Sequence, residues 1–309
     1  MTNRTWEEFW LNEGFTVFLE RKILGRLYGE PVRQFNCLCG WKDLKDSVDH
    51  FGHEHPFTAL HTKLDDIDPD DAFSSVPYER GSQFLIYLES LVGSEAFEKF
   101  LKAWVSRNIY GTVTAAELRA FFEEFFAAQK PQWEGKVDWN AWLSQPGMPP
   151  VDVLPLFDQT LAKEGIALAE RWISTQGEGC SSTDLAGWTS CQITYFLDKI
   201  LLAPDLQISP ETLDKMDKLY AFNSSKNSEI RFRWYSLAIR AHAVSIFPNI
   251  AGFLKEQGRM KFTRPLYRDL FNLGGSVGKE LALATFAEWR PNYHSITAKM
   301  VSKDLLLTN

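Results

Sequence analysis

Two carboxylates, Glu13 and Glu20, lie seven residues apart in a segment without internal proline that predicts a helix from about Trp6 to Tyr28. At about 100° per residue they project from nearly the same face of that helix. Apolar residues also occupy its other sides, so we expect the helix to be buried nearly all round. Because a buried carboxylate is unstable unless a cation, a metal or several donors accompany it, the two carboxylates imply a specific environment.

The residues alone leave two interpretations of these carboxylates open. The first is structural: Glu13 and Glu20 form ion pairs with Arg21, Arg26 or a more distant cation. The second is a metal site, because zinc commonly takes two imidazoles and one carboxylate and keeps its fourth position for water.

The sequence offers one tempting histidine cluster, which contains His50, His53 and His55. His53 and His55 are two residues apart, a spacing that directs their rings away from each other on a helix. Gly52 and Pro56 indicate a loop. We therefore expect a structural role for this cluster and no metal.

A second group with possible chemistry is basic: Arg259 and Lys261 follow Gly258 near the C-terminal end. Basic side chains in such a segment are most often simply solvated. The planar fork of a guanidinium also suits capture of a carboxylate, so both interpretations stay open.

Helical patterns dominate the elements that must position these residues. The first helix is expected to end near Gly29, and the acidic segment 61–71 reads as a loop. Further helices are predicted from about Tyr78, over 94–107 and over 114–128, the last with a Thr114–Glu117 capping box.

A proline-rich segment, 146–156, interrupts the helical pattern, and we place the domain boundary there. Eight helices with short connections are predicted beyond it, which suggests stacked pairs in a curved, solenoid-like bundle. They cover residues 157–175, 183–202, 209–220, 228–243, 247–257, 264–273, 276–288 and 295–305.

Composition restricts the class of protein. A net charge of −7 argues against a nucleic-acid-binding surface, and no apolar run approaches the ~18 residues of a membrane span. The N-terminus lacks the pattern of a secretory signal, and four cysteines are too few for a disulfide framework. We expect a cytoplasmic protein without stable membrane insertion.

Four segments carry a resemblance to a known family. Trp10–Gly14 reads W-L-N-E-G, and the others are the loop 66–81 and the stretches 227–234 and 257–266. Together they resemble the gluzincin zinc aminopeptidases, in particular the leukotriene A4 hydrolase group. The resemblance implies the C-terminal part of a thermolysin-like catalytic domain over 1–145, a linker over 146–156, and a right-handed superhelical all-helical domain over 157–309. It therefore implies a mostly α protein.

The resemblance implies that Glu13 is the third ligand of one zinc ion and that Glu20 orients a zinc-bound imidazole from the second shell. The family supplies the two imidazoles from an H-E-x-x-H motif about 18 residues before that glutamate. This motif does not occur in the 309 residues, so we expect the chain to be a C-terminal portion.

By the same resemblance, Tyr78 donates to the oxyanion of the peptide intermediate, and Asp70 directs water during epoxide hydrolysis. Arg259 and Lys261 hold the substrate carboxylate. The apolar substrate pocket would be formed by Trp6, Phe9, Leu64, Pro69 and Phe73. Phe73 departs from the mammalian pattern, which has tyrosine there, so the peptidase role is the firmer expectation.

The implied substrates are short peptides and a fatty-acid epoxide, leukotriene A4, hydrolysed to leukotriene B4. The implied activities are those of a metalloprotease and an epoxide hydrolase in the complete protein. The alternative is a truncated, inactive form that serves as a helical binding module. The residues do not determine the oligomeric state.

Overall fold

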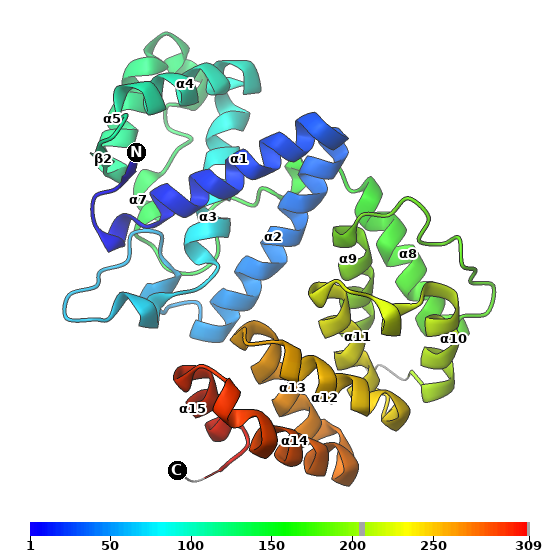
Figure 1. Cartoon of the computed structure of the whole chain (residues 1–309). Coiled ribbons are helices and arrows are strands. Elements are labelled where there is room, and N and C mark those ends of the chain that lie inside the picture. Colours follow the sequence, from blue (N-terminus) through cyan, green and yellow to red (C-terminus); the bar gives the residue numbers. More distant parts are fainter. Residues whose placement is uncertain (204–207, 308–309) are drawn as a thin grey trace. The chain divides into compact units, whose positions relative to one another are not determined.

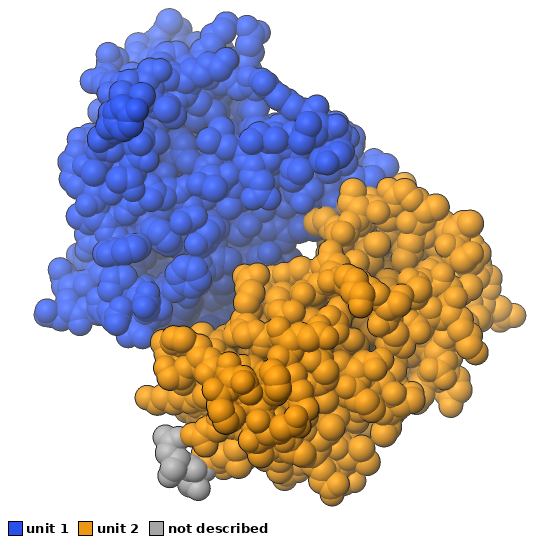
Figure 2. All heavy atoms as spheres, in the orientation of Figure 1, with its two compact units in different colours: residues 1–161 blue, residues 162–309 orange. Residues whose placement is uncertain are grey.

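The computed structural model describes residues 1–203 and 208–307, and nearly all regular structure in it is helical (Figure 1). Two short parallel strands, β1 (Thr2–Asn3) and β2 (Thr112–Val113), pair with each other. The chain divides into two compact units, Met1–Leu161 and Ala162–Asn309, coloured separately in Figure 2. The predicted mostly α fold is confirmed. None of the described helices has both the length and the apolar character needed to cross a membrane.

Unit 1 is built around the helix α1, which packs on α3 and α2. Its α-helices are α1 (Trp10–Tyr28), α2 (Glu30–Phe51), α3 (Val76–Val92), α4 (Ser94–Arg107), α5 (Ala115–Phe125), α6 (Lys130–Trp133) and α7 (Trp139–Leu143). Short 3-10 helices cover η1 (Trp6–Glu8), η2 (Pro56–Thr58), η3 (Pro69–Ala72), η4 (Ala127–Gln129) and η5 (Leu154–Leu156).

The predicted helix boundaries of unit 1 rest on local signals. The capping box is present: the hydroxyl of Thr114 accepts from the backbone N–H of Glu117, whose side chain accepts from the N–H of Thr114. The sequence analysis did not predict α2 or the short helices α6 and α7. Gly29, with φ 96°, ends α1, and α2 begins directly with Glu30 and Pro31. Proline is common in the first turn of a helix as well as just after a helix end, so Pro31 alone did not show that a new helix begins.

The expectation that α1 is buried nearly all round was wrong. One side, with Trp10 and Phe18, is fully covered by unit 1. On the other side Leu19, Ile23 and Leu27 are 42%, 57% and 66% exposed. Apolar residues occur on every side of α1, but within this chain only one side of the helix is buried.

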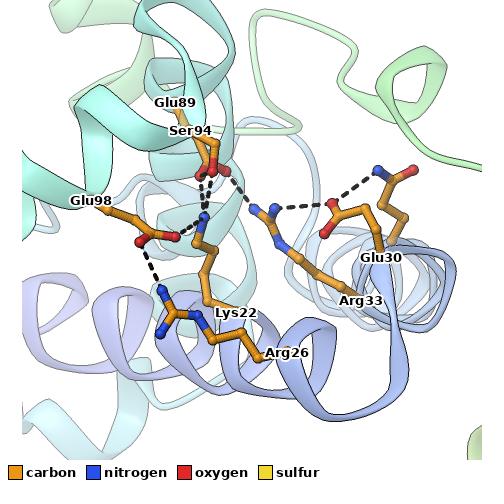
Figure 3. A network of polar contacts seen from close by, with 8 residues as sticks. Lys22, Arg26, Glu30, Arg33, Glu89, Ser94 and Glu98 are labelled. Carbon is orange, nitrogen blue, oxygen red and sulfur yellow. Dashed lines mark hydrogen bonds and ion pairs between the residues drawn. The ribbon is translucent and has the colours of Figure 1, made fainter.

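A network of ion pairs joins α1 to α2, α3 and α4 (Figure 3). The ammonium of Lys22 lies 2.7 Å from Glu89 on α3 and 3.0 Å from Glu98 on α4. Glu98 also accepts from Arg26 at 2.9 Å, and Glu89 pairs with Arg33 of α2. Among the described residues, Glu89 and Glu98 thus have two cationic partners each, while Glu30 at the edge of the network pairs with Arg33 alone.

Residues 146–156 lie inside unit 1 and contain no α-helix. The buried guanidinium of Arg80 donates to the backbone carbonyls of Thr58 at 2.8 Å, Gly147 at 2.7 Å and Ala141 at 3.0 Å. These bonds fix the start of the proline-rich segment to α3. Its assignment as a linker between domains remains a prediction.

Unit 2 is a stack of helices, as the sequence predicted. Along the chain α9, α11, α13 and α15 pack on one another in succession, and α12 packs on α14. The α-helices are α8 (Thr160–Thr175), α9 (Ser190–Leu201), α10 (Pro210–Tyr220), α11 (Ser228–Arg240), α12 (Phe247–Glu256), α13 (Met260–Leu273), α14 (Gly275–Trp289) and α15 (Ser295–Asp304). The first two predicted helices begin several residues too early, and the helix predicted from residue 264 begins several residues too late, since α13 starts at Met260.

Candidate functional site

The first turn of α1 carries a carboxylate without a partner. Glu13 is half-buried, and in the described part of the chain its side chain forms no hydrogen bond or ion pair. Burial raises the pKa of the Glu13 carboxyl above its ordinary value. A cation bound beside it would offset this loss of hydration, so Glu13 is suited to be a metal ligand.

The phenol of Tyr78, near the start of α3, lies within electrostatic range of Glu13. Its pKa is raised by burial and further by the negative charge of Glu13. The ordinary pKa of a phenol already lies well above neutrality, and the upward shift leaves Tyr78 protonated at neutral pH as a hydrogen-bond donor. The two residues from separate predicted helices are therefore brought together.

Aromatic rings surround this phenol. The ring of Phe9 meets that of Tyr78 at a centroid distance of 6.1 Å, and Phe73 meets it at 6.1 Å from another side. Trp6 extends the row, 5.5 Å from Phe9. Trp6 and Phe73 are 61% and 64% exposed, so these rings form an open apolar surface beside Glu13.

The loop between η2 and α3 carries the other predicted residues of unit 1. Leu64 donates its backbone N–H to Glu7 at 3.3 Å, which holds the loop beside η1. Pro69 opens η3, and Asp68 caps that helix by accepting from the N–H of Asp70 at 3.0 Å. The carboxylate of Asp70 is exposed, and its predicted role stays a prediction.

Glu20 is exposed on α1, two turns beyond Glu13, and it does not share the burial expected of the two carboxylates. Neither carboxylate pairs with the arginines proposed for them in the structural interpretation. Arg21 pairs with Glu79 at 2.8 Å, and Arg26 pairs with Glu98. The two named arginines are therefore not the partners of Glu13 within the described residues, and the second-shell role of Glu20 stays a prediction.

Among residues 1–203 and 208–307, no three His, Cys, Asp or Glu side chains gather in a way that could hold a metal. His53 faces Asp49 at 3.2 Å, while His55 accepts from the N–H of Phe57 and stacks on Phe51. Glu13 therefore fits a zinc site as one ligand, and the imidazoles would have to come from outside these residues.

Sequence reasoning missed a buried pair next to the site. Arg21 and Glu79 are 7% and 8% exposed, and Glu79 directly follows Tyr78 on α3. A signal was available in Gly40 of α2: a Cβ there would lie 1.9 Å from a carboxylate oxygen of Glu79. A glycine within a helix often marks such a close approach.

In unit 2 the two predicted cations differ. Arg259 is exposed at the N-terminus of α13 and lies over the ring of Phe262, 5.7 Å from its centroid. Lys261 pairs with Glu229 of α11 at 2.7 Å, and Glu229 also binds Arg233 at 2.9 Å. Lys261 lies in the first turn of α13, which begins at Met260 and thus earlier than the helix predicted from residue 264.

Two protein-family models match the chain. Residues 1–140 match the peptidase family M1 domain, and residues 188–305 match the C-terminal domain of leukotriene A4 hydrolase. The first match contains Glu13 and Tyr78, and the second contains Arg259 and Lys261.

Individual relatives agree with these matches. Leukotriene A-4 hydrolase of Xenopus laevis is 45% identical over 99% of this chain and 50% of its own length. Leucine aminopeptidase 2 of Aspergillus terreus is 40% identical over 99% of the chain and 49% of its own length. The solved structure of yeast LTA4 hydrolase in complex with bestatin superposes with a TM-score of 0.89, at 33% identity, over 99% of this chain and 51% of that one.

These matches define the class first: residues 1–140 are similar to the M1 peptidase domain, and the fold is that of a solved LTA4 hydrolase. More narrowly, the chain is similar to leukotriene A4 hydrolase, because the match to the C-terminal domain of that enzyme follows the peptidase match in the same chain. The chain spans about half the length of the curated relatives that it matches.

Proposed function

We propose that these residues form part of a zinc aminopeptidase that removes N-terminal residues from short peptides. One observation carries this proposal: a half-buried carboxylate without a partner, Glu13, lies within electrostatic range of the protonated phenol of Tyr78, on a surface of exposed aromatic rings. Glu13 would be one of three protein ligands of a single zinc ion. The remaining two ligands, both imidazoles, and a general-base carboxylate would belong to the whole protein outside these 309 residues.

When bound, zinc supplies a Lewis acid and an activated water for attack on the peptide carbonyl. Tyr78 donates its phenolic proton in a hydrogen bond to the oxyanion that forms on that carbonyl. A single such donor in a site without water is worth about 3 kcal/mol of transition-state stabilisation. The phenol has a proton to donate at neutral pH, since the pKa of Tyr78 is shifted upward from an ordinary value that already lies well above neutrality.

The apolar side of the site would receive the uncharged part of a substrate. Trp6, Phe9 and Phe73 are linked through ring contacts with one another or with Tyr78, and two of the three are more than half exposed. Leu64 and Pro69 lie on the loop that η1 holds through Glu7. Apolar N-terminal side chains are therefore the expected preference.

An epoxide hydrolase activity on leukotriene A4, giving leukotriene B4, is proposed as the second activity of the whole protein. Asp70 would direct the attacking water, and its exposure on η3 leaves the carboxylate accessible. Phe73 has no hydroxyl to contribute beside this route. The peptidase activity depends on neither feature and is the principal proposal.

The helical unit would bind the carboxylate that is common to a peptide and a fatty acid. Arg259 is exposed and forms no ion pair in the described part of the chain, which leaves its guanidinium available for a substrate. We place the protein in the cytoplasm, with small peptides and a fatty-acid epoxide as its substrates and no nucleic acid.

Metal analysis of the protein that carries an H-E-x-x-H segment ahead of residue 1 tests the proposal. Wild type is expected to hold one zinc per molecule and to cleave an apolar aminoacyl amide. Glu13→Gln should lose zinc and both activities together, because a neutral amide is a poor ligand for zinc. Retention of stoichiometric zinc and activity by Glu13→Gln would remove Glu13 from the site.

A further inference from the structure

Helices α1 and α3 touch backbone to backbone directly beside the site. A Cβ on Gly14 would lie 2.8 Å from the Cα of Gly81, and one on Gly81 would lie 3.0 Å from the Cα of Gly14. Both distances are shorter than ordinary contacts between carbon atoms. The two helices therefore approach this closely only because both positions are glycine.

A buried ion pair fixes the same two helices a short way from the crossing. Arg21 of α1 donates to Glu79 of α3 at 2.8 Å and to the hydroxyl of Ser82 at 3.3 Å. The backbone of α2 closes over this pair at Gly40, where a Cβ would lie 2.3 Å from the guanidinium. A buried pair tolerates little movement, because separation leaves two charges without partners.

These contacts are adjacent in sequence to the residues assigned to chemistry. Gly14 follows Glu13 directly, Glu79 follows Tyr78 directly, and Gly81 lies one turn beyond Tyr78 on α3. Residues three apart on a helix lie on neighbouring parts of its surface. A change in the distance between α1 and α3 at the glycine contact therefore moves Tyr78 relative to Glu13.

We infer that Gly14, Gly81 and the Arg21–Glu79 pair are positioning residues that hold the phenol of Tyr78 at its working distance from the carboxylate of Glu13. The inference rests on the proposed function, since it gives these two groups a shared task in catalysis. None of the four positioning residues is assigned to contact the substrate or the metal.

The electrostatic coupling between Glu13 and Tyr78 measures their separation without any catalysis. 3,5-Difluorotyrosine placed only at position 78 of the 309-residue chain titrates at a lower pH than tyrosine and is followed by fluorine NMR. The coupling is the decrease in the pKa of this probe that Glu13→Gln produces. It is expected in the otherwise unaltered chain, because the contact between Gly14 and Gly81 holds the adjacent Glu13 close to Tyr78, one turn before Gly81. Its absence there would overturn the inference.

Gly81→Ala pushes the two backbones apart at their contact and is expected to reduce this coupling by roughly a tenth or more, since charge interactions weaken with distance. The matched control is Gly252→Ala in α12, where nothing lies within 4 Å of an added Cβ. The control should leave the coupling unchanged. Full coupling in a folded Gly81→Ala chain would show that the glycine contact does not position Tyr78.

A second variant decides the matter if Gly81→Ala fails to unfold cooperatively. Arg21→Met combined with Glu79→Met removes both buried charges at once, a change that proteins often tolerate. Reduced coupling in this double variant supports the inference, and undiminished coupling overturns it. A whole protein without aminopeptidase activity would refute the proposed function and leave these NMR results as they stand.

Discussion

Two carboxylates of unit 1 lie on helices that pack together, yet their surroundings are opposite. Glu79 is almost fully buried and pairs with Arg21, which in turn reaches Ser82. Glu13 is only half-buried and has no partner among the described residues. Burial raises the pKa of both carboxyls, but only at Glu79 does a neighbouring cation oppose the shift.

The difference distinguishes carboxylates that stabilise the fold from a carboxylate that is available to bind a ligand. A carboxylate that is already paired has little left to offer a ligand, and its removal leaves an unpaired charge inside the protein. A partly desolvated carboxylate without a partner is stabilised by a cation from outside and costs the fold little when it is neutralised. Glu89 and Glu98, with their lysine and arginine partners, belong with Glu79 in the first class (Figure 3).

The largest effect should come from breaking the buried pair. Glu79→Gln leaves the guanidinium of Arg21 buried without its counter-charge and should lower the free energy of unfolding of unit 1 by about 3–5 kcal/mol. Urea denaturation of the 309-residue chain, fitted with separate transitions for the two units, measures this change.

Glu13→Gln is the matched control for that experiment, and its effect should have the opposite sign. Because the folded protein raises the pKa of Glu13, the charged form is disfavoured on folding. Wild type and Glu13→Gln should be equally stable at pH below the ordinary pKa of glutamate. As pH rises through the raised pKa, wild type should become slightly the less stable. A large loss of stability in Glu13→Gln at neutral pH would mean that Glu13 stabilises the fold instead.

The sequence predicted the helical elements well because their signals are local. The capping box at Thr114, the breaks at glycine and proline, and the helical periodicity of unit 2 each depend on a few neighbouring residues. The one long helix that was missed, α2, begins with Glu30-Pro31, a pair that also fits a helix end.

The site could be predicted only in part, because its geometry depends on contacts between distant segments. The motif around Glu13 indicated a metal ligand, but the choice of Glu79 as the partner of Arg21 joins residues 58 positions apart. The exposure of Leu19 and Ile23 could not be deduced from apolar spacing either, since spacing does not specify which faces a chain covers.

Tyr78→Phe tests whether the phenol near the unpaired Glu13 acts as an oxyanion donor. In the whole protein this change should preserve zinc, since Tyr78 is not a ligand, and lower kcat for peptides by about 10²-fold or more through loss of the oxyanion donor. Steady-state kinetics with metal analysis measures both quantities. Loss of zinc together with activity would mean that Tyr78 supports the ligand set and is not an oxyanion donor.

The same contrast between paired and unpaired charges recurs among the cations of unit 2. Lys261 is held by Glu229, whose carboxylate also binds Arg233, and Arg233 reaches Asp198 at 2.9 Å. Burial raises the pKa of Glu229, but its basic neighbours, Lys261 first among them, outweigh this and lower the pKa. Arg259 has no acidic partner in the part of the chain that the structure describes. Its guanidinium is therefore available to a ligand, unlike the ammonium of Lys261.

If Arg259 captures the carboxylate of a peptide, Arg259→Ala should lower kcat/KM of the whole protein for a tripeptide by at least about 10-fold. Lys261→Ala should cost less, because Glu229 already balances its charge and an ammonium lacks the fork of a guanidinium. Both penalties should shrink for the same tripeptide amidated at its C-terminus, which has no carboxylate to bind. Comparing the free acid with the amide on wild type and both variants separates binding from folding, since a structural defect lowers the rates of both substrates equally. An equal loss on both substrates would mean that Arg259 is a solvated or structural cation, and carboxylate capture would have to be assigned elsewhere.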